Sequence, residues 1–158
     1  MNGKLLDSEN VVELAASEKY AAIREVIFRA PTFRDLADIN LFEKSVMERE
    51  SIGSTGLGHG VAFAHGKLPE VPHMKVALGI SRQGIDFQSV DGSPVHLLFV
   101  VATRPDMHID YLECLSTLAR MARSDGFRED ILSCCREEDV EYKLSENFLR
   151  IRGCVETA

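Results

Sequence analysis

The chain has 158 residues and a formal net charge of -7, with 45% hydrophobic and 27% charged residues. This length is about that of one domain with a substantial core, and the composition is ordinary for a soluble globular protein. No apolar run approaches the roughly 20 residues that span a bilayer, so direct membrane insertion is not expected. The acidic balance and the lack of a basic stripe argue against nucleic acid as a partner.

The compartment and the number of domains follow from a few further features. The N-terminus lacks the basic and apolar regions of a signal peptide, which favours a cytoplasmic location. Without CxxC spacing, the scattered cysteines predict reduced thiols rather than a disulfide framework or a zinc site. Residues 1–158 contain no linker or repeat, so they are expected to form one domain. The cysteines are Cys114, Cys134, Cys135 and Cys154.

The first part of the chain predicts an edge strand, two helices and a loop. A short apolar run predicts the strand at 11–14. Ser17 is a candidate N-cap for a helix over 18–30, and a second helix is expected over 38–50. Residues 51–60 are expected to be loop. The residues of the second helix expected to face inward are Leu41, Phe42, Ser45 and Val46.

The rest of the chain predicts strands followed by helices. Strands are expected at 61–64, 75–81 and 95–103, with a short one near 85–87. The segment 95–103 is almost continuously apolar, as in a central strand covered on both faces. Helices are expected at 108–123, 128–135 and 138–149, the first burying Ile109, Leu112, Leu115, Leu118 and Ala119. Strands between helical segments predict a three-layer α/β/α sandwich with a mixed, roughly five-stranded central sheet.

The most informative segment runs from Gly53 to Lys67. A glycine-rich polar loop precedes a short apolar strand that is expected to end at His65. Three glycines, Gly56, Gly58 and Gly60, let the chain fold closely and bring backbone N–H groups near an anion. A histidine displayed at a strand end beside such a loop points to phosphoryl chemistry.

That chemistry assigns roles to several residues. A histidine with a pKa near 6.5 is largely neutral at cytoplasmic pH. Charge in the transition state lies on the phosphoryl oxygens, so catalysis needs fixed donors. Arg49 can supply a planar, permanently charged fork that lysine would not reproduce. Ser54, Thr55 and Gly56, with loop N–H groups, could hold phosphate oxygens. Taken alone, Arg49 could also be an ordinary residue in the last turn of a helix.

The run from Arg49 to Lys67, Arg-Glu-Ser-Ile-Gly-Ser-Thr-Gly-Leu-Gly-His-Gly-Val-Ala-Phe-Ala-His-Gly-Lys, carries a family resemblance. It closely resembles the active-site segment of fructose/mannitol-type enzyme IIA domains of the bacterial phosphoenolpyruvate-dependent sugar phosphotransferase system. The opening Arg-Glu-x-x-Gly-Ser-Thr-Gly-x-Gly is most similar to the nitrogen-regulatory members. The resemblance extends to Gly92–Phe99 and His108–Leu112, where the family has its central strand and following helix.

The resemblance implies a protein-histidine phosphotransferase. His65 would take a phosphoryl group on Nε2 from the phosphocarrier HPr and pass it to a IIB partner. His108 matches the second histidine of the family and would orient His65 or donate to the phosphate; the plainer alternative is a solvent-facing helix residue. Neither a metal nor another cofactor is implied.

Two positions differ from the family pattern. Ala64 stands where relatives usually carry proline, so the backbone is less constrained and has an additional N–H donor. His59 replaces what is commonly a small polar amide. Two alternatives to the phosphocarrier stay open: a regulatory binding module that is switched by phosphorylation of His65, and a scaffold that is not phosphorylated. A metal site made of His59, His65 and His73 is disfavoured, because no carboxylate or cysteine pattern accompanies them.

Overall fold

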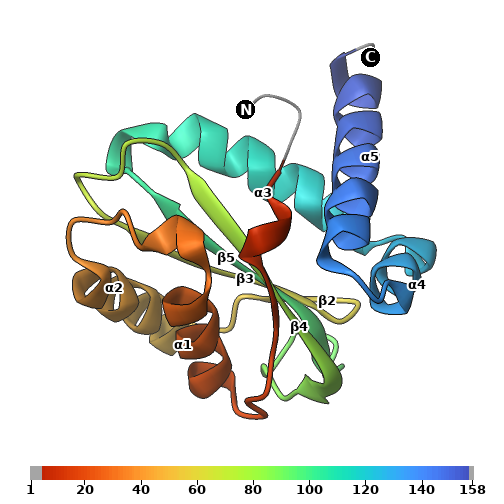
Figure 1. Ribbon diagram of the computed structural model, residues 1–158, viewed down its shortest axis with the longest axis horizontal. Helices are drawn as coiled ribbons and strands as arrows, with labels where there is room; N and C mark the ends of the chain where they lie inside the picture. Colours follow the sequence, from red (N-terminus) through yellow and green to blue (C-terminus); the bar gives the residue numbers. More distant parts are fainter. Residues whose placement is uncertain (1–4, 157–158) are drawn as a thin grey trace.

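The computed structural model describes residues 5–156, and its centre is one sheet in the order β1-β4-β5-β3-β2 (Figure 1). The strands are β1 (Val11–Glu13), β2 (Gly56–Gly58), β3 (Val61–Lys67), β4 (Lys75–Ile85) and β5 (Val95–Thr103). β1 pairs with β4 and β3 with β5 in parallel, whereas β4 pairs with β5 and β2 with β3 antiparallel. The mixed five-stranded sheet predicted from the sequence is confirmed.

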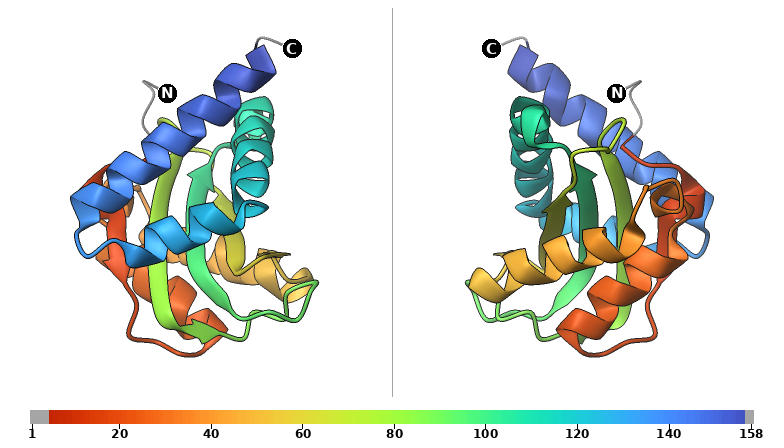
Figure 2. Two further views of the ribbon diagram at one scale, coloured as in Figure 1. Left: turned by 90° about the vertical axis from the view of Figure 1, so that its right-hand side faces the viewer. Right: turned by 90° about the vertical axis from the view of Figure 1, so that its left-hand side faces the viewer.

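Helices cover both faces of this sheet (Figures 1 and 2). α1 (Lys19–Arg29) and α2 (Ile39–Ile52) lie on one face, and α3 (His108–Ala122), α4 (Asp125–Ser133) and α5 (Glu137–Glu156) lie on the other. The short 3-10 helices are η1 (Ser8–Asn10), η2 (Pro31–Phe33) and η3 (Pro105–Met107). The predicted three-layer α/β/α sandwich is therefore confirmed. Within residues 5–156, no helix combines the length and apolar character needed to cross a membrane.

Each face of the sheet has its own apolar core, because successive side chains of a strand point to opposite faces. In β3, Val61 and Phe63 belong to the core under α3, α4 and α5. Ala62 and Ala64 belong to the core under α1 and α2. By the same alternation, His65 faces the α3 side.

Gly66 lets α2 approach β3 directly after His65. A Cβ at Gly66 would lie 2.8 Å from Cγ2 of Val46 and 3.1 Å from the Phe42 ring. Both of these side chains are fully buried. The close contact holds the first half of α2 against the end of β3, where the histidine lies.

Several predicted element boundaries are wrong. Glu18, and not Ser17, caps α1, because its longer carboxylate accepts the N–H groups of Tyr20 and Ala21. β3 does not end at His65, because parallel pairing with β5 continues to Lys67. The expected loop at 51–60 also contains the end of α2 and the strand β2.

The predicted buried face of α3 is wrong in part. Ile109 and Leu112 are 72% and 45% exposed, although Leu118 is buried as expected. The helix instead buries Tyr111, Cys114, Leu118, Met121 and Ala122. On α2, Leu41 is 48% exposed rather than inward-facing. Of the cysteines, Cys114, Cys134 and Cys135 are free thiols, as predicted.

Candidate functional site

His65 lies in β3 with its ring half-buried against α3. The centroid of its ring is 4.9 Å from that of Tyr111 and 6.4 Å from that of Phe63, and both pairs are tilted. Tilted ring pairs at such separations are favourable beyond the area that they bury. The two aromatic neighbours therefore restrict how the imidazole can turn.

A backbone contact fixes the tautomer of His65. Nδ1 lies 3.2 Å from the carbonyl oxygen of Phe63. A carbonyl oxygen can only accept, so Nδ1 carries the hydrogen. In a neutral ring the other nitrogen, Nε2, then keeps its lone pair. The structure thus presents Nε2 as the nucleophilic atom.

Burial lowers the pKa of His65 below its ordinary value of 6.5. The hydrogen bond to Phe63 opposes this shift, as does the negative charge of Glu50. The positive charges of Arg49 and Lys67 lower the pKa further, and the net shift is downward. The ring is therefore predominantly neutral at pH 7, the form that can attack a phosphorus atom.

Arg49 stands in the last turn of α2, on the opposite face of the sheet from α3. Its charge nevertheless acts on the pKa of both His65 and Tyr111, so all three belong to one electrostatic site. Nη1 of Arg49 donates to the carbonyl oxygen of Gly53 at 2.9 Å. Since guanidinium has five N–H donors, that bond orients the group and leaves others for an oxyanion.

Tyr111 keeps its proton at the site. Burial raises its pKa to about 12, although the charge of Arg49 acts to lower it. The side chain is a neutral hydroxyl at pH 7, able to donate a hydrogen bond. Tyr111 therefore adds no negative charge that would repel a phosphoryl group.

A buried ionic network anchors the loop that runs beside His65. The N–H of Thr55 donates to Glu50 at 3.0 Å, and its hydroxyl donates to the other carboxylate oxygen at 2.5 Å. Nζ of Lys19 lies 2.8 Å from the same carboxylate, and the two side chains are 7% and 0% exposed. The carbonyl of Thr55 accepts from the N–H of Phe63 at 3.0 Å. The network thus connects α1 and α2 to the strand that carries the histidine.

Ser54 and Gly56 fix the shape of the same loop. The Ser54 hydroxyl donates to the carbonyl of Phe87 and accepts from the N–H of Gly56 at 3.1 Å. A Cβ at Gly56 would lie 2.2 Å from Oγ of Ser89, so a larger residue would displace that neighbour. The candidate phosphate-binding residues Ser54, Thr55 and Gly56 therefore have intramolecular partners in this structure. Their contact with phosphate stays a prediction.

Of the remaining histidines, His59, His73 and His108 are exposed, whereas His96 is half-buried in β5 with Nδ1 2.8 Å from the carbonyl oxygen of Ser81. His108 is the first residue of α3 and is exposed. The residue of α3 whose ring contacts His65 is Tyr111, one turn further along, so the role of His108 stays a prediction. His59 is exposed with φ of 57°, and its N–H donates to Asp91 at 2.9 Å. Among the described residues, no three His, Cys, Asp or Glu side chains are grouped as metal ligands would be.

Sequence reasoning assigned no role to three residues of this site. Tyr111 had a local signal, since it follows His108 by three positions and so lies one turn further along a helix. Glu50 adjoins Arg49 in the recognised motif, but its partners could not be read from the motif. Lys19 carried no signal, because its contact with Glu50 depends on how α1 packs against α2.

Comparisons with known proteins identify the family. Residues 4–147 match the family described as "Phosphoenolpyruvate-dependent sugar phosphotransferase system, EIIA 2". The chain belongs to this EIIA family, and its role is that of a phosphocarrier of the phosphotransferase system.

The relatives include a component of a fructose-specific PTS system and nitrogen regulatory proteins. The chain is 30% identical over 129 residues to the PTS system fructose-specific EIIABC component of Bacillus subtilis, covering 82% of this chain and 20% of that longer protein. It is 33% identical over 118 residues to the nitrogen regulatory protein of Bradyrhizobium diazoefficiens, covering 75% and 76% of the two chains. The crystal structure of nitrogen regulatory protein IIA-Ntr from Neisseria meningitidis has a TM-score of 0.82 and 27% identity, covering 90% of this chain and 98% of that one.

Proposed function

We propose that residues 1–158 act as one EIIA domain in which Nε2 of His65 receives a phosphoryl group from an HPr-type carrier. The group then passes to a IIB partner, so the activity is that of a protein-histidine phosphotransferase. The hydrogen bond from Nδ1 to the Phe63 carbonyl carries this proposal, because it leaves Nε2 as the free nucleophile. The lowered pKa of His65 supports it by keeping the ring neutral.

The transfer exchanges one nitrogen–phosphorus bond for another. The lone pair of Nε2 attacks phosphorus as the bond between phosphorus and the donor's nitrogen breaks, and no water or other reactant is consumed. Positive charge develops on the imidazole of His65, which strengthens the bond from Nδ1–H to the Phe63 carbonyl. In this proposal, the guanidinium of Arg49 offsets the charge on the phosphoryl oxygens.

Exposed apolar side chains on the two helices of the site support a protein partner. Ile52 at the end of α2 is 83% exposed, and Ile109 at the start of α3 is 72% exposed. Ile52 lies three residues after Arg49, and Ile109 directly follows His108. Such residues would be buried by a carrier protein that docks over His65.

A second candidate function is a regulatory module whose partner binding changes when His65 is phosphorylated. The similarity to nitrogen regulatory proteins favours it. A phosphoryl group would add about 1.5 to 2 negative charges, by analogy with other phosphorylated side chains. That charge would oppose the docking of an apolar partner surface that covers His65 together with Ile109 and Ile52.

Phosphorylation in a reconstituted system tests the proposal. The chain is incubated with labelled phosphoenolpyruvate, enzyme I and HPr, and a IIB domain is then added. We expect labelling of the wild type and of His73→Gln, a matched exposed histidine, but none of His65→Gln. Label that moves to IIB supports the carrier, and label that stays on the chain supports the regulator. An unlabelled wild type would refute both and favour the scaffold.

A further inference from the structure

The side chain of α3 that lies against the reactive histidine is a tyrosine. The ring centroid of Tyr111 is 4.9 Å from that of His65 and 5.9 Å from that of Phe63. Within residues 5–156, Phe63 and Tyr111 are the aromatic residues that pair with the His65 ring. His108 is exposed at the first position of the same helix. A phenol therefore stands beside the histidine on the side that α3 covers.

The hydroxyl of Tyr111 is available to a ligand. In the part of the chain that the structure describes, no residue forms a hydrogen bond with it. The buried side-chain atoms without a partner are Oγ of Ser89 and Oγ of Ser145, and the Tyr111 oxygen is not one of them. This oxygen therefore reaches solvent, although the residue as a whole is only 7% exposed. The packed ring thus holds one polar atom at the surface, where it can donate to an incoming group.

Arg49 reaches the same site from α2. Its charge acts on both rings, since it lowers the pKa of His65 and opposes the raised pKa of Tyr111. Nδ1 of His65 is already bonded to the carbonyl of Phe63, so Nε2 is the atom that is left for phosphorus. A phosphoryl group on Nε2 would therefore lie close to two kinds of donor, a guanidinium and a neutral hydroxyl.

We propose that Tyr111 is a catalytic residue of the phosphotransfer, with its hydroxyl donating a hydrogen bond to a phosphoryl oxygen carried on Nε2 of His65. This inference rests on the proposed function, and it gives Tyr111 the role of phosphate donor that was expected of His108. Phosphorus moves from one nitrogen to another, and the hydroxyl keeps its proton throughout. A neutral donor stabilises the charge on the phosphoryl oxygens without adding a charge of its own.

Transfer rates test the hydroxyl separately from the ring. Tyr111→Phe keeps the packing and removes the donor, so labelling by phospho-HPr should slow about 10- to 100-fold, the factor expected for a hydrogen bond to a charged group. Tyr142→Phe is the matched control, because Tyr142 is 66% exposed on α5, and it should transfer at the wild-type rate. The two variants should have the same Tm. A larger loss of rate in His108→Gln than in Tyr111→Phe would overturn the proposal.

Phosphorus NMR gives a second measurement that needs neither HPr nor IIB. The full chain is phosphorylated chemically with phosphoramidate, and the pKa of the phosphoryl group on His65 is followed by titration. A hydrogen bond from Tyr111 favours the dianion, so Tyr111→Phe should raise this pKa by about 0.5 or more. If Tyr111 only packs against His65, the pKa stays the same, which would refute the donor role.

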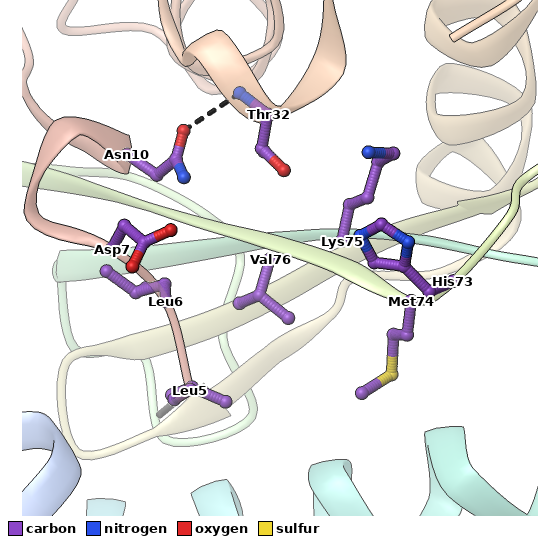
Figure 3. Close-up of a pocket in the computed structure, with 9 residues that line it drawn as sticks. All are labelled: Leu5, Leu6, Asp7, Asn10, Thr32, His73, Met74, Lys75 and Val76. Carbon is purple, nitrogen blue, oxygen red and sulfur yellow. Dashed lines mark hydrogen bonds between the residues drawn. The ribbon is translucent and has the colours of Figure 1, made fainter. Parts of the chain in front are cut away.

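Histidine variants assign the phosphorus signal. The His65 signal is the one that is lost in His65→Gln and kept in His73→Gln. His73 is exposed beside a cavity of about 180 Å³ between η1, η2 and the start of β4 (Figure 3). Neither Arg49, His65 nor Tyr111 lines that cavity.

The two measurements separate this inference from the proposed function. A wild type that phospho-HPr labels, together with Tyr111→Phe equal to Tyr142→Phe in both rate and phosphoryl pKa, would refute the role of Tyr111 alone. A wild type that only phosphoramidate labels would refute the carrier function, and a raised phosphoryl pKa in Tyr111→Phe would then still support the hydrogen bond. In the wild type, with tyrosine labelled with carbon-13 at Cζ, phosphorylation should shift the Tyr111 signal and leave Tyr142 unchanged. An unshifted Tyr111 signal would contradict the proposal without any variant.

Discussion

Replacing Glu50 with glutamine should destabilise the protein strongly, because three contacts converge on its carboxylate. They are the N–H and hydroxyl of Thr55 and the ammonium group of Lys19, at 2.5–3.0 Å. Glutamine has no charge to balance Lys19, whose side chain is only 7% exposed. Removing one partner of a buried ion pair costs about 3–5 kcal/mol. For a domain of this size, 1 kcal/mol corresponds to about 2–4 °C in Tm, so we expect a decrease of about 6–20 °C.

Thermal and urea unfolding measure this effect, and the chain supplies a matched control. Lys44 and Glu48 also form a pair, at 4.0 Å, but with side chains 70% and 67% exposed. Glu48→Gln should therefore cost at most about 1 kcal/mol. The double variant Lys19→Met/Glu50→Gln should recover part of the loss, because the unpaired charge is removed. The reasoning is refuted if Glu50→Gln costs no more than Glu48→Gln, or if the double variant is less stable than Glu50→Gln alone.

Three further predictions concern the histidine and its surroundings. Arg49→Lys should slow phosphotransfer far more than it lowers Tm, because charge remains while the fork geometry is lost; equal losses in rate and stability would contradict this. Because the pKa of His65 is lowered, the unfolded chain binds more protons between the folded pKa and 6.5. The contribution of the neutral ring to stability is therefore complete above pH 6.5 and is lost as pH falls through the folded pKa. Urea unfolding should show that the free energy of unfolding decreases at acid pH in the wild type, and that it decreases less in His65→Gln. NMR titration of the His65 ring should give a pKa below 6.5, and a value at or above 6.5 would refute the assignment. Ala64→Pro should retain phosphotransfer but cost about 1 kcal/mol, since alternation along β3 points the Ala64 N–H away from Thr55 and towards β5; an unfolded variant would show that proline is not accommodated there.

The elements predictable from sequence were those with strong local patterns. The apolar run at 95–103 predicted both ends of β5 correctly, because a central strand is apolar on both faces. The resemblance around Arg49 and His65 located the site before any geometry was known. Both depend on residues that are neighbours in the chain or share one motif.

What sequence reasoning missed depends on packing between distant segments. The rotation of α3 buries Tyr111 and exposes Ile109, whereas the apolar pattern alone favoured a buried face that includes Ile109. The pairing of Lys19 with Glu50 joins two helices, and nothing in either helix marks it. The tautomer of His65 depends on one backbone contact to Phe63, which no residue pattern can predict.

Mapping of phosphohistidine tests the central claim most directly. After reaction with phosphoenolpyruvate, enzyme I and HPr, mass spectrometry locates the modified residue and phosphorus NMR identifies the nitrogen. We predict a single phosphoryl group on Nε2 of His65. A phosphoryl group on Nδ1, on His108 or on any other residue would contradict the account, as would a folded wild-type chain that accepts none.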